Sequence, residues 1–166
     1  MYLTDIDIIE MVNNNGLIEN FNKENLGCIS YDLTVSKIIL PETSGEQSSY
    51  NLMPNETIFI ASEENIKLPN NCLGIITLRN ACIRMGLDIA SPVYHPGHHT
   101  KIFTRITNIS NGEITINSGM SIVSIMFCKL NKDVLTPYNG TYTNEFNYQG
   151  IGKFHKVDIP KTTNSN

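Results

Sequence analysis

The sequence predicts one mainly β domain, folded as an antiparallel sandwich or barrel with a short N-terminal helix. A chain of 166 residues is the usual length of a single domain and can bury a core of its own. Runs of strand character fill most of the chain after the helix, and turn signals separate them at a spacing of roughly 8–12 residues. This spacing is typical of antiparallel strands and not of parallel βαβ units.

Residues 4–13 predict the short helix. Thr4 is a suitable N-cap, and Asp5 and Asp7 lie in the first turn, where carboxylates interact favourably with the helix dipole. The run Asn13-Asn14-Asn15-Gly16 is expected to end it. The apolar stripe of this helix consists of Ile8, Met11 and Val12.

Alternating and continuous apolar runs predict the strands that follow. We expect strands at residues 33–40, 57–61, 73–78, 87–90, 101–107, 113–116 and 121–129. Turn signals between them are Asn70-Asn71, Pro96-Gly97, Asn111-Gly112 and Ser118-Gly119.

The last part of the chain differs in composition from the rest. Residues 137–166 mix Tyr, Asn, Gly and Gln with few apolar side chains, so we expect a flexible C-terminal arm or flap after a β domain of residues 1–136. The arm is either a disordered tail or a flap that folds over a ligand. Tyr148 and Gln149 are its candidate ligand contacts.

Composition excludes several classes of partner. A formal net charge of −4 argues against a nucleic-acid polymer. The longest nearly unbroken apolar run, residues 122–128, is far too short for a membrane span.

The N-terminus has no basic and apolar leader, so the expected compartment is the cytoplasm. The four cysteines lack close spacing, which favours reduced thiols over disulfides or a zinc site.

The three arginines, Arg79, Arg84 and Arg105, all lie in one central segment. Arg79 and Arg84 stand five residues apart in a segment where a strand is expected to end and a short helical turn to begin, and there side chains and backbone N–H groups could bind a polyphosphate. Surface arginines in contact with carboxylates explain the same spacing equally well.

Three of the four histidines gather in the run Tyr94-His95-Pro96-Gly97-His98-His99. Imidazoles can bind a metal or act as a base near neutral pH. Because no cysteine or carboxylate stands beside them, and because alternation sends His98 and His99 in different directions, we expect no metal site there.

Together these segments resemble the dUTPase superfamily and, within it, the dCTP deaminase branch. The resemblance covers roughly residues 1–153 in unbroken order. It is carried by Met1-Tyr2-Leu3-Thr4-Asp5, Ser30-Tyr31-Asp32-Leu33-Thr34-Val35, Arg79-Asn80-Ala81-Cys82-Ile83-Arg84-Met85-Gly86-Leu87, Pro96-Gly97 through Asn108, Asn117-Ser118-Gly119-Met120, Ile125-Met126-Phe127, Pro137-Tyr138 and Tyr148-Gln149-Gly150.

The resemblance implies a dUTPase-like distorted antiparallel β-barrel that assembles as a homotrimer, with nucleotide sites at subunit boundaries. It implies a pyrimidine deoxynucleoside triphosphate as ligand, bound through Arg79, Asn80, Arg84, Tyr148 and Gln149. Mg²⁺ is expected to arrive with the triphosphate, because the sequence shows no carboxylate cluster to hold it alone.

The chain departs from the family pattern at its catalytic positions. The deaminase glutamate corresponds to Arg105, and a guanidinium offers only donors, so it cannot act as a general base. The aspartate of the dUTP-hydrolysing members corresponds to His95, which could still act as a base. A ligand-contacting serine corresponds to Asn80.

Three functions stay open on the sequence. The first is an enzyme, a dCTP deaminase or dUTP diphosphatase-like hydrolase, in which His95 or another residue takes over catalysis. The second is a catalytically inactive trimer that senses or sequesters a nucleotide or binds a protein partner. The third is a structural assembly without a ligand, in which the arginines are exposed or held in ion pairs.

Overall fold

The computed structural model describes residues 1–41 and 45–150, which form two α-helices, one 3₁₀ helix and eleven strands. The helices are α1 (Asp5–Asn15), η1 (Lys23–Asn25) and α2 (Asn80–Met85). The strands are β1 (Ile18–Glu19), β2 (Tyr31–Ile39), β3 (Glu46–Gln47), β4 (Ser49–Leu52), β5 (Thr57–Lys67), β6 (Cys72–Leu78), β7 (Leu87–Ala90), β8 (Val93–Tyr94), β9 (His99–Asn108), β10 (Ile114–Asn117) and β11 (Ser121–Lys129).

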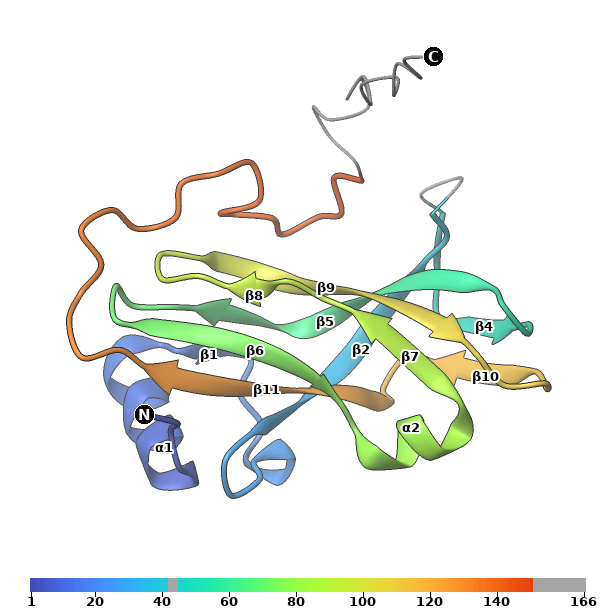
Figure 1. Cartoon of the computed structure of the whole chain (residues 1–166), viewed down its shortest axis with the longest axis horizontal. Helices are drawn as coiled ribbons and strands as arrows, with labels where there is room; N and C mark the ends of the chain where they lie inside the picture. The colour runs from blue at the N-terminus through green and yellow to red at the C-terminus, as the bar shows by residue number, and fades with distance from the viewer. Residues whose placement is uncertain (42–44, 151–166) are drawn as a thin grey trace, which may run out of the picture.

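The strands of the main sheet follow the order β7-β9-β5-β2-β11-β6-β8, and each neighbouring pair in this order is antiparallel. Figure 1 shows that this sheet is strongly curled, so that it forms a half-barrel. The short strands β10 and β4 pair separately beside it. The prediction of a mainly β, antiparallel fold with a short N-terminal helix is therefore confirmed.

Helix α1 begins and ends where the local sequence places its caps. Thr4 and Asp7 form a capping box, in which each side chain accepts a hydrogen bond from the other residue's backbone N–H. The helix ends at Gly16, whose φ of +67° lies in the left-handed region that glycine tolerates. Ile8 is fully buried and anchors the helix to the core.

The core fills the inside of the curled sheet. Strand β2 shows how it is built, because inward and outward side chains alternate along it, with Tyr31, Leu33 and Val35 buried. Other fully buried core side chains include Leu52, Ile58, Ile66, Ile102, Ile106, Ile122, Ile125 and Phe127.

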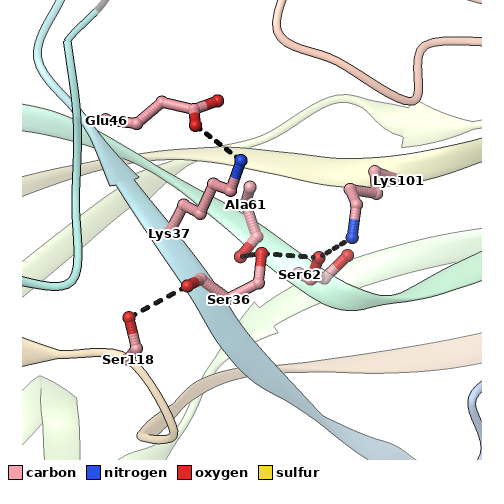
Figure 2. A network of polar contacts seen from close by, with 7 residues as sticks. All are labelled: Ser36, Lys37, Glu46, Ala61, Ser62, Lys101 and Ser118. Carbon is pink, nitrogen blue, oxygen red and sulfur yellow. Dashed lines mark hydrogen bonds and ion pairs between the residues drawn. The ribbon is translucent and has the colours of Figure 1, made fainter.

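Polar contacts stabilise the sheet where the register between β2 and β5 shifts. Ser36 lies at a register shift between β2 and β5, and its hydroxyl donates to the carbonyls of Ala61 and Ser62. Figure 2 shows these bonds together with the Lys101 ammonium, which donates to the Ser62 carbonyl. The Ser118 hydroxyl donates to the Ser36 carbonyl at 2.9 Å. Strand β5 can therefore bend over the core while its backbone groups stay paired.

Strand β5 is longer than predicted. The prediction follows the apolar run and therefore misses the second half of the strand, which is polar. The prediction ends at Ala61, whereas the strand continues to Lys67 through the run Ser62-Glu63-Glu64-Asn65. Glu64 is only 2% exposed and accepts hydrogen bonds from the Tyr31 hydroxyl and from the N–H and hydroxyl of Thr34. Pairing with β1 and β9 thus places a charged residue inside the fold.

None of the helices within residues 1–41 and 45–150 is long and apolar enough to cross a membrane.

Candidate functional site

A cleft of about 1500 Å³ lies between strands β5 and β9, the turn that joins β8 to β9, and residues 137–150. These residues are the described part of the expected C-terminal arm and are called the arm below, whereas residues 151–166 lie outside the described residues. In Figure 1 the arm runs on the side of the molecule away from α2. The cleft is lined by aromatic side chains and by a few polar ones. The aromatic residues are Tyr50, Phe59, Tyr94, Phe103, Tyr138, Tyr142 and Tyr148, and the polar residues include Glu56, His95, His98, Arg105, Glu145 and Gln149.

The arm is joined to the edge of β9 by backbone hydrogen bonds. Strand β7 pairs with β9 only from Arg105 to Asn108, which leaves the first half of that edge open. There the His99 N–H donates to the Thr143 carbonyl and the Lys101 N–H to the Glu145 carbonyl, both at 3.0 Å. The arm therefore continues the sheet beyond the end of β7 and forms one wall of the cleft.

The turn between β8 and β9 also contacts the arm. Gly97 has a φ of +96°, and a Cβ at this position would lie 2.8 Å from Pro137 Cβ, so only glycine lets the arm approach so closely. The Tyr138 N–H donates to the Pro96 carbonyl at 2.9 Å. The Tyr138 ring stacks on His98, with centroids 4.2 Å apart.

The histidines of this turn have different surroundings. His98 is buried, its Nδ1 lies 2.9 Å from the His95 carbonyl oxygen, and burial lowers the pKa of its imidazole. His95 is exposed and faces the cleft. His99 instead pairs with Glu19, with 2.8 Å between Nε2 and the carboxylate. Within residues 1–41 and 45–150, no group of three or more His, Cys, Asp or Glu side chains is arranged to hold a metal ion.

A small apolar cluster on the outer face of the sheet contributes Phe59, Phe103 and Tyr148 to the lining of the cleft. It consists of Ile39, Ala61 and Phe103, with Phe59 and Tyr148 packed against it. The Tyr148 ring lies 5.0 Å from the Phe59 ring and 5.6 Å from the Phe103 ring, measured between centroids. Arg105 pairs with Phe59 in register, so its exposed side chain stands at the edge of this cluster.

Two buried ionisable groups lie deeper in the cleft. The Tyr94 hydroxyl accepts from the Phe103 N–H at 3.3 Å, and burial raises the pKa of this phenol to about 12. Glu145 is only 8% exposed, and burial raises the pKa of its carboxyl above its ordinary value. The sequence reasoning missed Glu145, although it is the only charged residue between Pro137 and Gly150, which was a usable signal.

The structure separates the predicted site residues into two groups. His95, Arg105, Tyr148 and Gln149 all line the cleft. Arg79, Asn80 and Arg84 belong instead to α2 and its N-cap, on the other side of the molecule in Figure 1. These three residues do not line the cleft, so the fold of the single chain does not bring the two groups together.

Contacts within the chain hold the arginines of the α2 group. The Arg79 Nε atom lies 3.0 Å from Asp32 Oδ2, and its Nη1 donates to the Ser121 carbonyl at 2.9 Å. The Arg84 Nε donates to the side-chain oxygen of Asn80 at 3.5 Å. Both guanidinium groups are partly exposed and could donate further hydrogen bonds to an anion.

Comparisons with known proteins agree on one family. Residues 39–130 match the protein family described as dCTP deaminase-like. The dCTP deaminase of Thermococcus kodakarensis is 30% identical over 133 residues, which cover 76% of this chain and 84% of the relative.

Solved structures show the same fold. The crystal structure of the 2'-deoxycytidine 5'-triphosphate deaminase from Agrobacterium tumefaciens aligns with a TM-score of 0.63 and 13% identity over 76% of this chain, which spans 47% of that one. The native EIAV dUTPase aligns with a TM-score of 0.53 and 18% identity, covering 75% of this chain and 92% of the other. The prediction of a dUTPase-like fold is therefore confirmed.

Proposed function

Because the chain belongs to the dCTP deaminase-like family, we propose that its cleft binds a pyrimidine deoxynucleoside triphosphate. The observation that carries the proposal is the composition of the cleft. Tyr148 and Phe103 offer aromatic faces for a base, and Arg105 offers a guanidinium for phosphate oxygens. Gln149 adds an amide that can donate to and accept from the ligand.

The residue at position 105 favours a protein that binds the nucleotide without deaminating it. Deamination of cytosine needs a group that takes a proton from water and passes one to the 4-amino group. The guanidinium of Arg105 offers only hydrogen-bond donors, so it cannot do this. We therefore propose that the protein senses or sequesters the nucleotide, or presents the bound complex to a protein partner.

The separation of α2 from the cleft supports a homotrimer as the binding form. Arg79, Asn80 and Arg84 are candidate phosphate contacts, yet they lie apart from the cleft of their own subunit. In a closed trimer the α2 of one subunit can face the cleft of the next. The exposed apolar side chains of Ile83 and Met85 on the same helix fit such a contact.

The residues of the cleft suit a Mg²⁺ ion that is bound by the triphosphate and not by a protein carboxylate. Both oxygens of the cleft carboxylate Glu56 already accept hydrogen bonds, from the Tyr50 hydroxyl and the Met53 N–H. Phosphate oxygens are preferred ligands of Mg²⁺. We propose that the ion reaches the cleft bound to the nucleotide and neutralises part of its charge.

Calorimetric titration of the full chain with dCTP and dUTP in the presence of Mg²⁺ tests the proposed function. We expect saturable binding of one of the two nucleotides or of both, weakened at least tenfold in Arg105→Ala. Lys132→Ala, a change of an exposed cation outside the cleft, is the matched control and should bind normally. Absence of binding by the wild type would refute the proposal.

Catalysis by another group is the second candidate, because His95 is exposed in the cleft and its imidazole can act as a base. Incubation with dCTP and dUTP, followed by chromatographic separation of the products, distinguishes the two functions. Turnover that is lost in His95→Gln would establish an enzyme. The Arg105→Glu variant adds a second test, since it supplies a carboxylate at the position where deaminases of this family use one.

A further inference from the structure

The chain contains three Asn-Gly pairs, which are Asn15-Gly16, Asn111-Gly112 and Asn139-Gly140. In such a pair the glycine nitrogen can attack the amide carbon of the asparagine side chain, because no Cβ on the glycine hinders the approach. The attack requires that the glycine N–H is free of a hydrogen bond and that the backbone can turn toward the side chain. The fold therefore decides which of the three pairs can react.

Hydrogen bonds hold the first two pairs. The Gly16 N–H donates to the Val12 carbonyl at 3.0 Å, in the cap that ends α1. The Gly112 N–H donates to the Ser110 hydroxyl at 3.3 Å, and the Gly112 carbonyl accepts from Asn108 Nδ2 at 2.7 Å. A reaction at either pair must therefore wait for a local opening of the fold.

The third pair, Asn139-Gly140, lies in the arm and has no such restraint on its reacting atoms. Both residues are exposed. Among residues 1–41 and 45–150, no oxygen accepts a hydrogen bond from the Gly140 N–H, and the Asn139 side chain has no hydrogen-bond partner. The nitrogen and the amide carbon can therefore meet without the loss of a hydrogen bond by either group.

Asn139-Gly140 connects the two points at which the arm is attached. Before the pair, the Tyr138 ring stacks on His98. After it, the Gly140 carbonyl accepts from the Thr143 hydroxyl at 2.8 Å, and the Thr143 carbonyl accepts from the His99 N–H at 3.0 Å. The length of backbone between the two points decides whether both attachments can form at once.

This connection has no slack. The Tyr138 phenol lies so close to Gly140 that a Cβ on the glycine would collide with it. A longer backbone between these two residues would move the ring or the glycine from its present place. It would therefore weaken the stack on His98 or the bonds to Thr143.

We infer that Asn139-Gly140 is a site of spontaneous deamidation whose isoaspartate product detaches the arm from β9. The Gly140 nitrogen bonds to Asn139 Cγ, the bond from Cγ to the amide nitrogen breaks, and ammonia leaves with the proton of the Gly140 N–H. Water then adds to one of the two carbonyl carbons of the resulting succinimide and opens the ring, which gives aspartate or isoaspartate.

Isoaspartate carries the backbone through the side chain and so adds one methylene between Tyr138 and Gly140. The added length falls in the connection that has no slack. The reaction needs only water, and the inference does not depend on which ligand the cleft binds.

Incubation of the full chain in mildly alkaline buffer, folded and in urea, tests the reaction. Tandem mass spectrometry locates the deamidated residue. In the folded chain we expect Asn139 to react at least about tenfold faster than Asn15 or Asn111, because those pairs must first lose hydrogen bonds. In urea the three rates should be similar. Equal rates at the three pairs in the folded chain would overturn the inference.

Hydrogen exchange after the incubation tests the effect on the arm. The His99 and Lys101 amides, which donate to the arm, should exchange faster in the incubated wild type. Asn139→Gln is the matched control, because its longer side chain does not form the five-membered ring, and its incubation should change nothing. Asn139→Asp adds the charge without lengthening the backbone and should exchange like the fresh wild type.

Two results would contradict detachment of the arm. Unchanged protection of both amides in the deamidated wild type would show that the arm tolerates the longer backbone. Equally fast exchange in Asn139→Asp would show that the new charge, and not the added methylene, releases the arm.

Discussion

The phenol ring of Tyr138 lies flat on the imidazole of His98, with the ring planes 9° apart and the centroids at 4.2 Å. The two residues come from the arm and from the turn between β8 and β9. The stack thus joins the arm to the turn at the point where the arm reaches the cleft.

Replacing Tyr138 by alanine should loosen the arm. The change removes the stack, which is worth about 1 kcal/mol. Hydrogen exchange followed by mass spectrometry should show faster exchange at the His99 and Lys101 amides, which donate to the arm. Tyr138→Phe keeps the ring and should exchange like the wild type. Equal protection in the alanine variant would show that the backbone bonds alone hold the arm.

Protonation of His98 should destabilise the protein at mildly acidic pH. Burial holds the pKa of His98 in the folded chain below its ordinary value of 6.5. Between the folded and unfolded pKa values the unfolded chain binds more protons, so the free energy of unfolding falls as the pH drops below about 6.5. Urea denaturation from pH 7.5 to pH 5.5 measures this fall.

His98→Phe is the control for this pH dependence, because it keeps an aromatic ring but cannot be protonated. The stability of the variant relative to the wild type should rise as the pH decreases. A constant difference across the range would show that His98 does not contribute to the acid sensitivity.

The Arg79–Asp32 ion pair allows the structural and binding roles of Arg79 to be separated. Arg79→Ala and Asp32→Asn both remove the pair, whose Nε and Oδ2 atoms lie 3.0 Å apart. Since both side chains are partly exposed, each change should cost less than about 1 kcal/mol of stability. Only Arg79→Ala removes the cation, so only this variant should lose the thermal stabilisation that we expect from dCTP. Equal loss in both variants would show that Arg79 acts only through its ion pair.

Removing the buried carboxylate of Glu64 should destabilise the whole fold. Glu64→Ala leaves the Tyr31 hydroxyl and the N–H and hydroxyl of Thr34 without their acceptor, at a cost of about 3 kcal/mol or more. Urea denaturation measures the loss. The neighbouring Glu63 is exposed, so Glu63→Ala should change stability by less than about 0.5 kcal/mol. Similar effects of the two changes would contradict the structural role of Glu64.

Much of the sheet could be predicted from local patterns. Residues 87–90 and 121–129 are strands with the predicted bounds, because apolar residues mark them and turn residues flank them. The second half of β5 was missed because Glu64 interrupts the apolar pattern. The short strands β1, β3, β4 and β8 have two to four residues each, which is too few to give a periodic signal.

The fold class, the family and four residues that line the cleft could be predicted from the chain alone, since strand periodicity and motif order are local properties. The burial of Glu145 could not be predicted, because it arises when the arm pairs with β9, more than forty residues earlier in the chain. The position of α2 and its arginines apart from the cleft is likewise a result of long-range packing. Both facts depend on which strand edges meet, and that is set by long-range pairing and packing, which no local pattern encodes.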